Sequence, residues 1–259
     1  MASLPIAQLC IAAVIGAASG AIGSFILLRK MALVGDAVSH VALPGIAVAL
    51  AYRVDPFWGV ITVLLAAAAI IWWLEARSRL PVDALVGLLF TASLAIGILT
   101  IPDTEILESL FGAFPALSPL AFGATVGAAS LSLLLTFWLA RPFLFAIVSE
   151  DLARIGKVGR GYELLLLVIF SVVVALGIKL VGTLLMGALT IIPAAIARNL
   201  SAGMRQYMIT AAVLGATISI AGVAAASIWS IRPGPVVILL GVGVFALSLP
   251  AVGLKRPAG

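Results

Sequence analysis

The sequence is a succession of apolar runs, each about 20 residues long, separated by short clusters of charge. A run of this length, wound as a helix, crosses the ~30 Å hydrocarbon core of a bilayer. The chain is 64% hydrophobic with a mean hydropathy of +1.30, above the ~45–50% apolar content of water-soluble domains. The runs are too long for barrel strands of about ten residues, and helices satisfy their own backbone inside lipid. The sequence therefore predicts an all-α polytopic transmembrane bundle.

We expect a single transmembrane domain over residues 1–259, with about 8 or 9 membrane-spanning helices. The predicted runs are residues 6–28, 31–51, 57–74, 82–101, 119–140, 162–179, 181–197, 206–229 and 235–253. Two places leave the number of spans open. Two runs meet at Lys179, where one span with a broken helix would look the same, and residues 105–120 fit a partly inserted helix.

The basic residues predict the orientation of the chain. If the first loop faces the cytoplasm, that side carries all 15 Lys and Arg residues except Arg53, Lys179 and Arg232. Short cytoplasmic loops accumulate Lys and Arg, so we expect an external N-terminus and an internal C-terminus. The basic residues form no patch with interleaved aromatic residues. Nucleic acid is therefore not an expected partner, despite the net charge of +5.

Two further features limit the chemistry of the chain. Its single cysteine, Cys10, excludes an internal disulfide and is expected to be a small buried hydrophobic side chain. A phosphate-binding loop needs Lys followed by Ser or Thr, but the lysines precede Met31, Val158, Leu180 and Arg256. We therefore expect no enzymatic activity in this chain. ATP-driven transport would require a separate ATPase.

One apolar run contains two ionisable side chains, Asp36 and the only histidine, His40. Spaced at i and i+4 they share a helix face, with Cβ atoms about 5–6 Å apart. Counted from the preceding Arg29–Lys30 pair at ~1.5 Å per residue, they lie roughly 9 and 15 Å into the membrane. Ionisable groups at that depth mark substrate or proton routes. The structural alternative is an Asp36–His40 hydrogen bond that fixes helix packing.

Carboxylate oxygen and imidazole nitrogen are ligands for zinc, manganese and ferrous iron. We therefore predict that Asp36 and His40 bind a divalent metal ion in transit, with no permanently bound cofactor. One chain supplies too few ligands, whereas two copies around a dimer axis would supply four. Pro44 and Gly45 follow on the same run; the proline removes a backbone donor, which predicts a gate or a tolerated kink.

The most charged loop, at about residues 141–161, contains a short segment with the signals of a complete helix. A serine stands at its N-cap, acids in its first turn, an arginine late and a glycine at its end. We predict that this segment docks on an ATPase partner; a solvated connector is the alternative. The predicted coupling residues are Ser149, Glu150, Asp151, Arg154 and Gly156.

The stretch from Arg29 to Gly45 resembles the signature of the zinc, manganese and iron permeases of ATP-binding-cassette importers. Further segments that resemble this family, in the same order, are residues 83–87, 110–112, 150–156, 180–182 and 192–198. Two departures are visible. Ile196 replaces a threonine of the family pattern, and the coupling segment lacks the usual opening of an acid followed by proline.

The resemblance implies a type II importer fold in a bacterial or archaeal plasma membrane. It implies a homodimer or paired permeases surrounded by lipid, cytoplasmic ATPase subunits and an extracytoplasmic metal-binding protein that delivers the ion. The family's intramembrane metal site maps onto Asp36 and His40.

Two other functions use the same residue types. A proton-coupled secondary metal transporter would also place Asp36 and His40 in the membrane, without an ATPase. An intramembrane hydrolase would use Ser39 as nucleophile. Adjacent residues on a helix point about 100° apart, so His40 cannot readily accept the Ser39 proton. This geometry disfavours the hydrolase.

Overall fold

The computed structural model describes residues 6–31, 34–78, 80, 82–100, 118–148, 159, 161–183 and 186–250. Within these ranges every regular element is an α-helix. The helices are α1 (Ile6–Leu28), α2 (Val34–Ala51), α3 (Pro56–Arg77), α4 (Val82–Thr100), α6 (Pro119–Trp138), α7 (Ala140–Val148), α9 (Gly161–Val181), α10 (Met186–Leu200), α11 (Met204–Trp229) and α12 (Pro233–Ser248). The predicted all-α bundle is confirmed.

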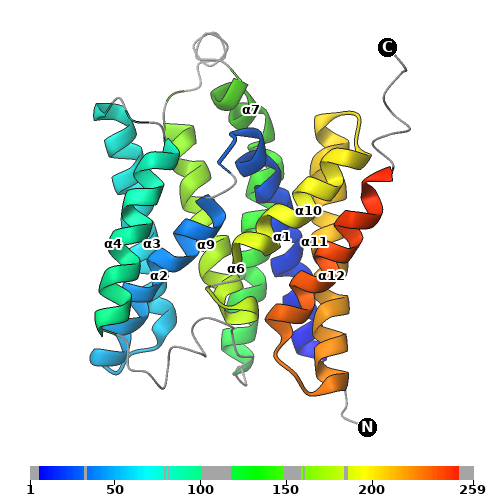
Figure 1. Cartoon of the computed structure of the whole chain (residues 1–259), viewed down its shortest axis with the longest axis horizontal. Helices are drawn as coiled ribbons and strands as arrows, with labels where there is room; N and C mark the ends of the chain where they lie inside the picture. Colours follow the sequence, from blue (N-terminus) through cyan, green and yellow to red (C-terminus); the bar gives the residue numbers. More distant parts are fainter. Residues whose placement is uncertain are drawn as a thin grey trace.

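Each of the nine predicted runs overlaps one of these helices over most of its length (Figure 1). In the described part of the chain, the six helices α1, α3, α4, α6, α9 and α11 are long and apolar enough to cross a membrane. The helices α2, α10 and α12 are shorter but also apolar.

Helix α7 corrects the prediction of a loop beginning near residue 141. Its residues Ala140–Val148 are helical, and Phe143 is fully buried. The Phe143 ring meets the Phe25 ring of α1 edge-on, with centroids 5.5 Å apart. The charge of this segment suggested a loop, and Pro142 is tolerated in the first helical turn, where no intrahelical donor is needed.

Helix α1 lies at the centre of the bundle and packs against α11, α10, α6 and α9. Its closest neighbour is α11, because glycines let the two backbones approach. A Cβ placed on Gly16 would lie 2.8 Å from the Gly215 carbonyl carbon, and one on Gly20 would lie 2.8 Å from that of Ala211. Small residues allow such close crossings in membrane helices.

The ends of the bundle differ in charge. We call basic end the end at which α1, α3, α6 and α10 finish, next to Arg29, Arg77, Arg141 and Arg198, and far end the opposite one (Figure 1). Exposed aromatic side chains lie near both ends. Tyr52, Trp58 and Trp229 lie at the far end, and Trp73 and Trp138 at the basic end. Trp and Tyr are enriched at membrane interfaces, so these two groups agree with a membrane-spanning bundle.

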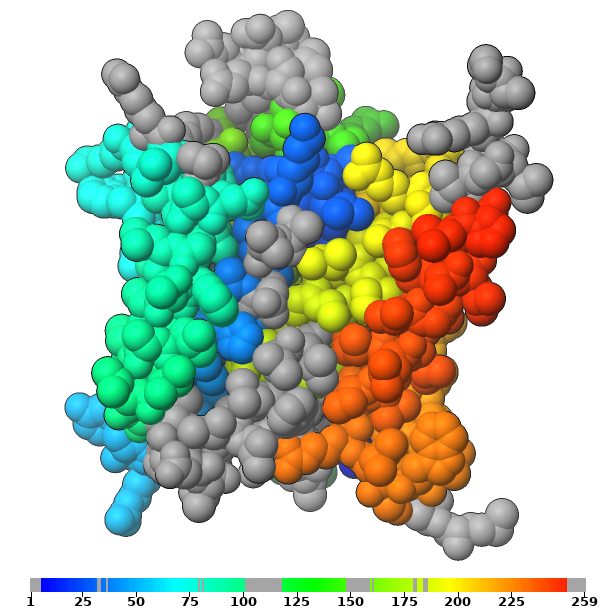
Figure 2. Space-filling model, in the orientation of Figure 1, coloured from blue at the N-terminus to red at the C-terminus, as the bar shows by residue number. Residues whose placement is uncertain are grey.

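Figure 2 shows α4 on one side of the visible face and α12 on the other, with parts of α2 and α10 between them. Helix α9 ends in a buried turn at Gly182, whose φ of 81° suits glycine, and α10 then starts inside the bundle. Cys10, expected to be buried, is exposed, because it lies near the start of α1, where few helices cover it.

Candidate metal site

His40 lies in the second turn of α2 and is only 6% exposed. Helix α2 is held by α3, α4, α10 and α9. The His40 ring meets the Phe90 ring of α4 edge-on, with centroids 5.3 Å apart and an interplanar angle of 68°. The His40 imidazole therefore lies inside the bundle, and Phe90 is a neighbour that no sequence pattern indicated.

Asp36 lies in the first turn of α2, four residues before His40, so its place on the helix is as predicted. Its side chain lies outside the described part of the structure. The joint coordination of an ion by Asp36 and His40 therefore stays a prediction.

The first turn of α2 lies deep in the bundle. A Cβ on Gly35 would lie 3.2 Å from the Cα of Gly187, in the first turn of α10. Helix α10 then continues to Leu200 at the basic end, about 20 Å further along its axis at 1.5 Å per residue. The start of α2 is thus well inside the apolar layer. Gly187 lines this position beside Gly35.

Pro44 does not end α2, which continues to Ala51. Because proline has no N–H, Pro44 cannot donate to the His40 carbonyl, and α2 lacks one of its internal hydrogen bonds there. Gly45 has a second role, at the crossing with α3. A Cβ on Gly45 would lie 2.7 Å from the Gly59 carbonyl carbon. A gate at Pro44 and Gly45 stays a prediction.

Ser39 is fully buried, and its Oγ donates a hydrogen bond to the Gly35 carbonyl oxygen at 3.0 Å. This bond directs the hydroxyl along its own helix and supports the argument against a Ser39 nucleophile. Among the residues that the structure describes, no three His, Cys, Asp or Glu side chains form a metal-binding group.

The predicted coupling segment lies outside the described residues. Helix α7 ends at Val148, and the next described helix, α9, begins at Gly161. The roles assigned to Ser149, Glu150, Asp151, Arg154 and Gly156 therefore stay predictions.

Comparison with protein families matches residues 4–251 to the ABC 3 transport family. The chain is 31% identical over 242 residues to the manganese import system permease protein ScaB of Streptococcus gordonii, covering 92% of this chain and 87% of that protein. It is 28% identical over 239 residues to the high-affinity zinc uptake system membrane protein ZnuB of Haemophilus influenzae, covering 88% and 90%.

Two solved structures share the fold. PsaBC from Streptococcus pneumoniae in complex with Fab has a chain with a TM-score of 0.82 and 31% identity, covering 96% of this chain and 94% of that chain. An inward-facing putative metal-chelate type ABC transporter has a TM-score of 0.79 at 17% identity, covering 95% and 85%. The family and its permease relatives place ATP hydrolysis on a separate subunit. This protein belongs to the ABC 3 transport family, as a multi-pass membrane permease subunit of an ATP-binding-cassette importer.

Proposed function

We propose that this chain conducts divalent manganese or zinc into the cytoplasm, and that Asp36 and His40 bind the ion during passage. The observation that carries the proposal is the burial of His40 on α2 inside an otherwise apolar bundle. Relatives named for manganese import and for zinc uptake support the same pair of ions. Ferrous iron suits the same ligands and is the third candidate.

The residue chemistry fits a transient site. A neutral imidazole supplies a nitrogen ligand, and a carboxylate supplies an oxygen ligand whose charge offsets part of the charge of the ion. Two ligands bind an ion less tightly than four, which suits a site that must release it. We propose that two permease copies meet around the pathway, so that four ligands converge in one state of the transport cycle.

Helices α2 and α10 are the proposed moving parts of the pathway. They touch at Gly35 and Gly187, and each contains an internal proline, Pro44 in α2 and Pro193 in α10. A proline removes one internal hydrogen bond, so bending there disrupts less of the helix. We place the gate at Pro44 and Gly45, directly beyond His40. With α12, these shorter helices complete the eight or nine crossings.

The partners follow from the family. We propose two cytoplasmic ATPase subunits, contacted by the segment from Ser149 to Gly156, and an extracytoplasmic protein that delivers the ion at the far end. Membership of an ATP-binding-cassette family favours this arrangement over a proton-coupled secondary transporter. The basic end would then face the cytoplasm.

The test is uptake of radioactive manganese or zinc by the whole importer in proteoliposomes loaded with ATP. Asp36→Asn and His40→Ala should each lower uptake by at least roughly 10–100-fold, which is the loss expected when a residue that only supports a metal ligand is removed. Neither substitution should lower the melting temperature. Ser39→Ala is the matched control, since it removes a neighbouring buried polar group whose hydroxyl donates a hydrogen bond to the Gly35 carbonyl. It should leave uptake near the wild-type rate.

The packing alternative gives the opposite pattern. Asn would keep a structural hydrogen bond at position 36, and His40→Ala would lower the melting temperature. Wild-type uptake by a well-folded Asp36→Asn protein would refute the metal site. Uptake that survives omission of ATP but stops when the proton gradient is collapsed would instead indicate the secondary transporter.

A further inference from the structure

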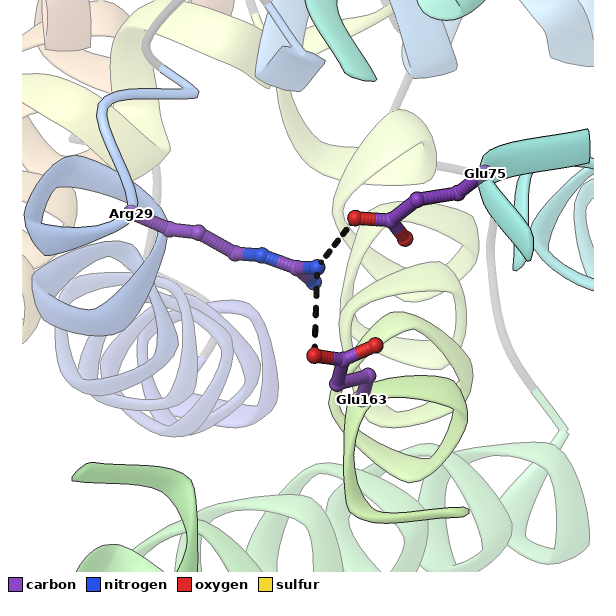
Figure 3. Close-up of polar contacts among 3 residues, drawn as sticks. All are labelled: Arg29, Glu75 and Glu163. Carbon is purple, nitrogen blue, oxygen red and sulfur yellow. Dashed lines mark hydrogen bonds and ion pairs between the residues drawn. The ribbon is translucent and has the colours of Figure 1, made fainter. Parts of the chain in front are cut away.

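Three charged side chains from three helices meet at the basic end. The Nη2 atom of Arg29 lies 2.8 Å from Oε1 of Glu75, to which it donates a hydrogen bond, and 3.7 Å from Oε1 of Glu163 (Figure 3). Arg29 directly follows α1, Glu75 lies in the last turn of α3, and Glu163 lies in the first turn of α9. We call these residues the Arg29 cluster.

The Arg29 cluster is screened from solvent better than an ordinary surface ion pair. The side chain of Arg29 is 13% exposed, and those of Glu75 and Glu163 are 20% and 21% exposed. Partly buried charges interact more strongly than exposed ones, because less water and salt surround them. The ends of α1, α3 and α9 are therefore energetically linked at this point.

The two arms of the cluster are unequal. Glu75 is within hydrogen-bond distance of Arg29, whereas Glu163 at 3.7 Å is an ion pair of longer range. Among the described residues, Nη1 of Arg29 and Oε2 of Glu75 have no hydrogen-bond partner, although both atoms are buried. A spare donor and a spare acceptor leave room for a second arrangement of the same three groups.

The cluster also controls where the chain enters the bundle towards His40. Directly after Arg29, Lys30 adopts φ 61°, and the Met31 N–H donates to the Ile26 carbonyl at 3.1 Å, which closes the end of α1. Met31 is already buried, and α2 begins at Val34. Only a few residues therefore separate Arg29 from the helix that contains His40.

We infer that Arg29 is a positioning residue for transport, whose ion pair with Glu163 breaks and reforms in each cycle while its hydrogen bond to Glu75 persists. Movement of α9 relative to α1 would then shift the start of α2, and with it the intramembrane site. This inference rests on the proposed function, because it assigns to the cluster the task of coupling ATP hydrolysis to movement of the ion.

The experiment measures manganese or zinc uptake and ATP hydrolysis by the same purified importer in proteoliposomes. In Arg29→Gln and Glu163→Gln, the number of ions moved per ATP should fall at least about fivefold, the lower limit of typical coupling between sites, while hydrolysis continues. In Arg29→Gln protein, Glu163→Gln should lower this number by less than it does in the wild type, because the pair is already broken. Asp83→Asn is the matched control, since Asp83 is an exposed acid in the first turn of α4 at the same end.

A purely structural link predicts a different pattern. Loss of Glu75 or of Glu163 would then lower the melting temperature and the amount of complex to the same degree, with an unchanged number of ions per ATP. That result would overturn the inference, as would additive effects of Arg29→Gln and Glu163→Gln. If Arg29→Gln fails to assemble, Arg29→Lys replaces it, because lysine keeps the charge but not the planar guanidinium group. The number of ions that Arg29→Lys protein moves per ATP then decides the question in the same way.

Transport by the wild-type importer separates the role of the Arg29 cluster from the proposed function. If the wild-type importer moves neither manganese nor zinc, the proposed function is wrong. If the wild type moves an ion but every cluster variant keeps the wild-type number of ions per ATP, only the inference is wrong.

Discussion

The crossing of α1 and α11 allows a sharp test of the packing, because it places backbone against backbone. A Cβ added at Gly20 would lie 2.8 Å from the Ala211 carbonyl carbon and 3.4 Å from the Ala212 nitrogen. Both atoms belong to the main chain of α11, so no flexible side chain can move aside. The substitution Gly20→Ala therefore has to separate the two helices.

The size of the effect follows from these distances. Carbon atoms in contact sit about 3.5–4.0 Å apart, so the helices must move by roughly 1 Å. Overpacking of this kind costs about 1–3 kcal/mol, and weakened Cα–H···O contacts add about 0.5–1 kcal/mol. Alanine regains up to about 1 kcal/mol of helix propensity over glycine. We expect a net destabilisation of about 1–2 kcal/mol.

Gly127→Ala is the matched control. Gly127 is also a glycine inside a long apolar helix, α6, but a Cβ there would meet no atom within 4 Å. Only the gain in helix propensity remains, up to about 1 kcal/mol. Thermal unfolding in one detergent, followed by tryptophan fluorescence, compares the two variants. At about 2–4 °C per kcal/mol for a chain of this size, Gly20→Ala should melt several degrees below Gly127→Ala. Equal melting temperatures would refute the close crossing.

Three further predictions concern the ends of the helices. A cysteine at Ser149 in a Cys10→Ser protein should react with a membrane-impermeant reagent only after the membrane is opened; labelling of intact cells would reverse the proposed orientation. Gly156→Pro should leave the permease folded while ATP hydrolysis no longer drives uptake, and full uptake would rule out docking by that segment. Lys30→Gly should raise stability by about 1 kcal/mol, because glycine adopts the left-handed conformation at φ 61° without steric conflict; an unchanged melting temperature would contradict this account.

The positions of the helices could be predicted from the sequence because the cause is local. A span needs a run of apolar residues of fixed length, and such runs are visible without any knowledge of the neighbours. Helix α7 could not be predicted in this way, because its cause is not local. Its fit depends on Phe143 meeting Phe25, which is more than a hundred residues away, and its own sequence contains Arg141 and Pro142.

The site was predicted in part. His40 was found from its position in an apolar run, and its burial agrees. Phe90, which meets the His40 ring, and Gly187, which lies beside Gly35, come from other helices and follow no rule of spacing. The sequence assigns Gly45 only to a gate or kink with Pro44. Its contact with Gly59 depends on how α2 crosses α3, which no sequence pattern indicates.

The Arg29 cluster could not be predicted from the sequence at all. In the sequence, Arg29 serves only to predict the orientation and the depth of the site, and no pattern assigns a role to Glu75 or Glu163. Arg29 and Glu75 are 46 positions apart, and no local pattern relates them. Only the assembled bundle brings the ends of α1, α3 and α9 together.

Helix α3 has exposed tryptophans near both ends, Trp58 at the far end and Trp73 at the basic end, where the Arg77 guanidinium lies 4.5 Å from the Trp73 ring centroid. Helices α2 and α10 contain no aromatic residue besides His40. A change in bilayer thickness therefore acts on α3 through anchors at both of its ends, and α3 passes a tilt to α2 where the two helices cross. A mismatch between bilayer thickness and helix length should thus tilt α3. Lipids of different acyl-chain length should change the rate of ion transport more than they change the affinity of the permease for the ion.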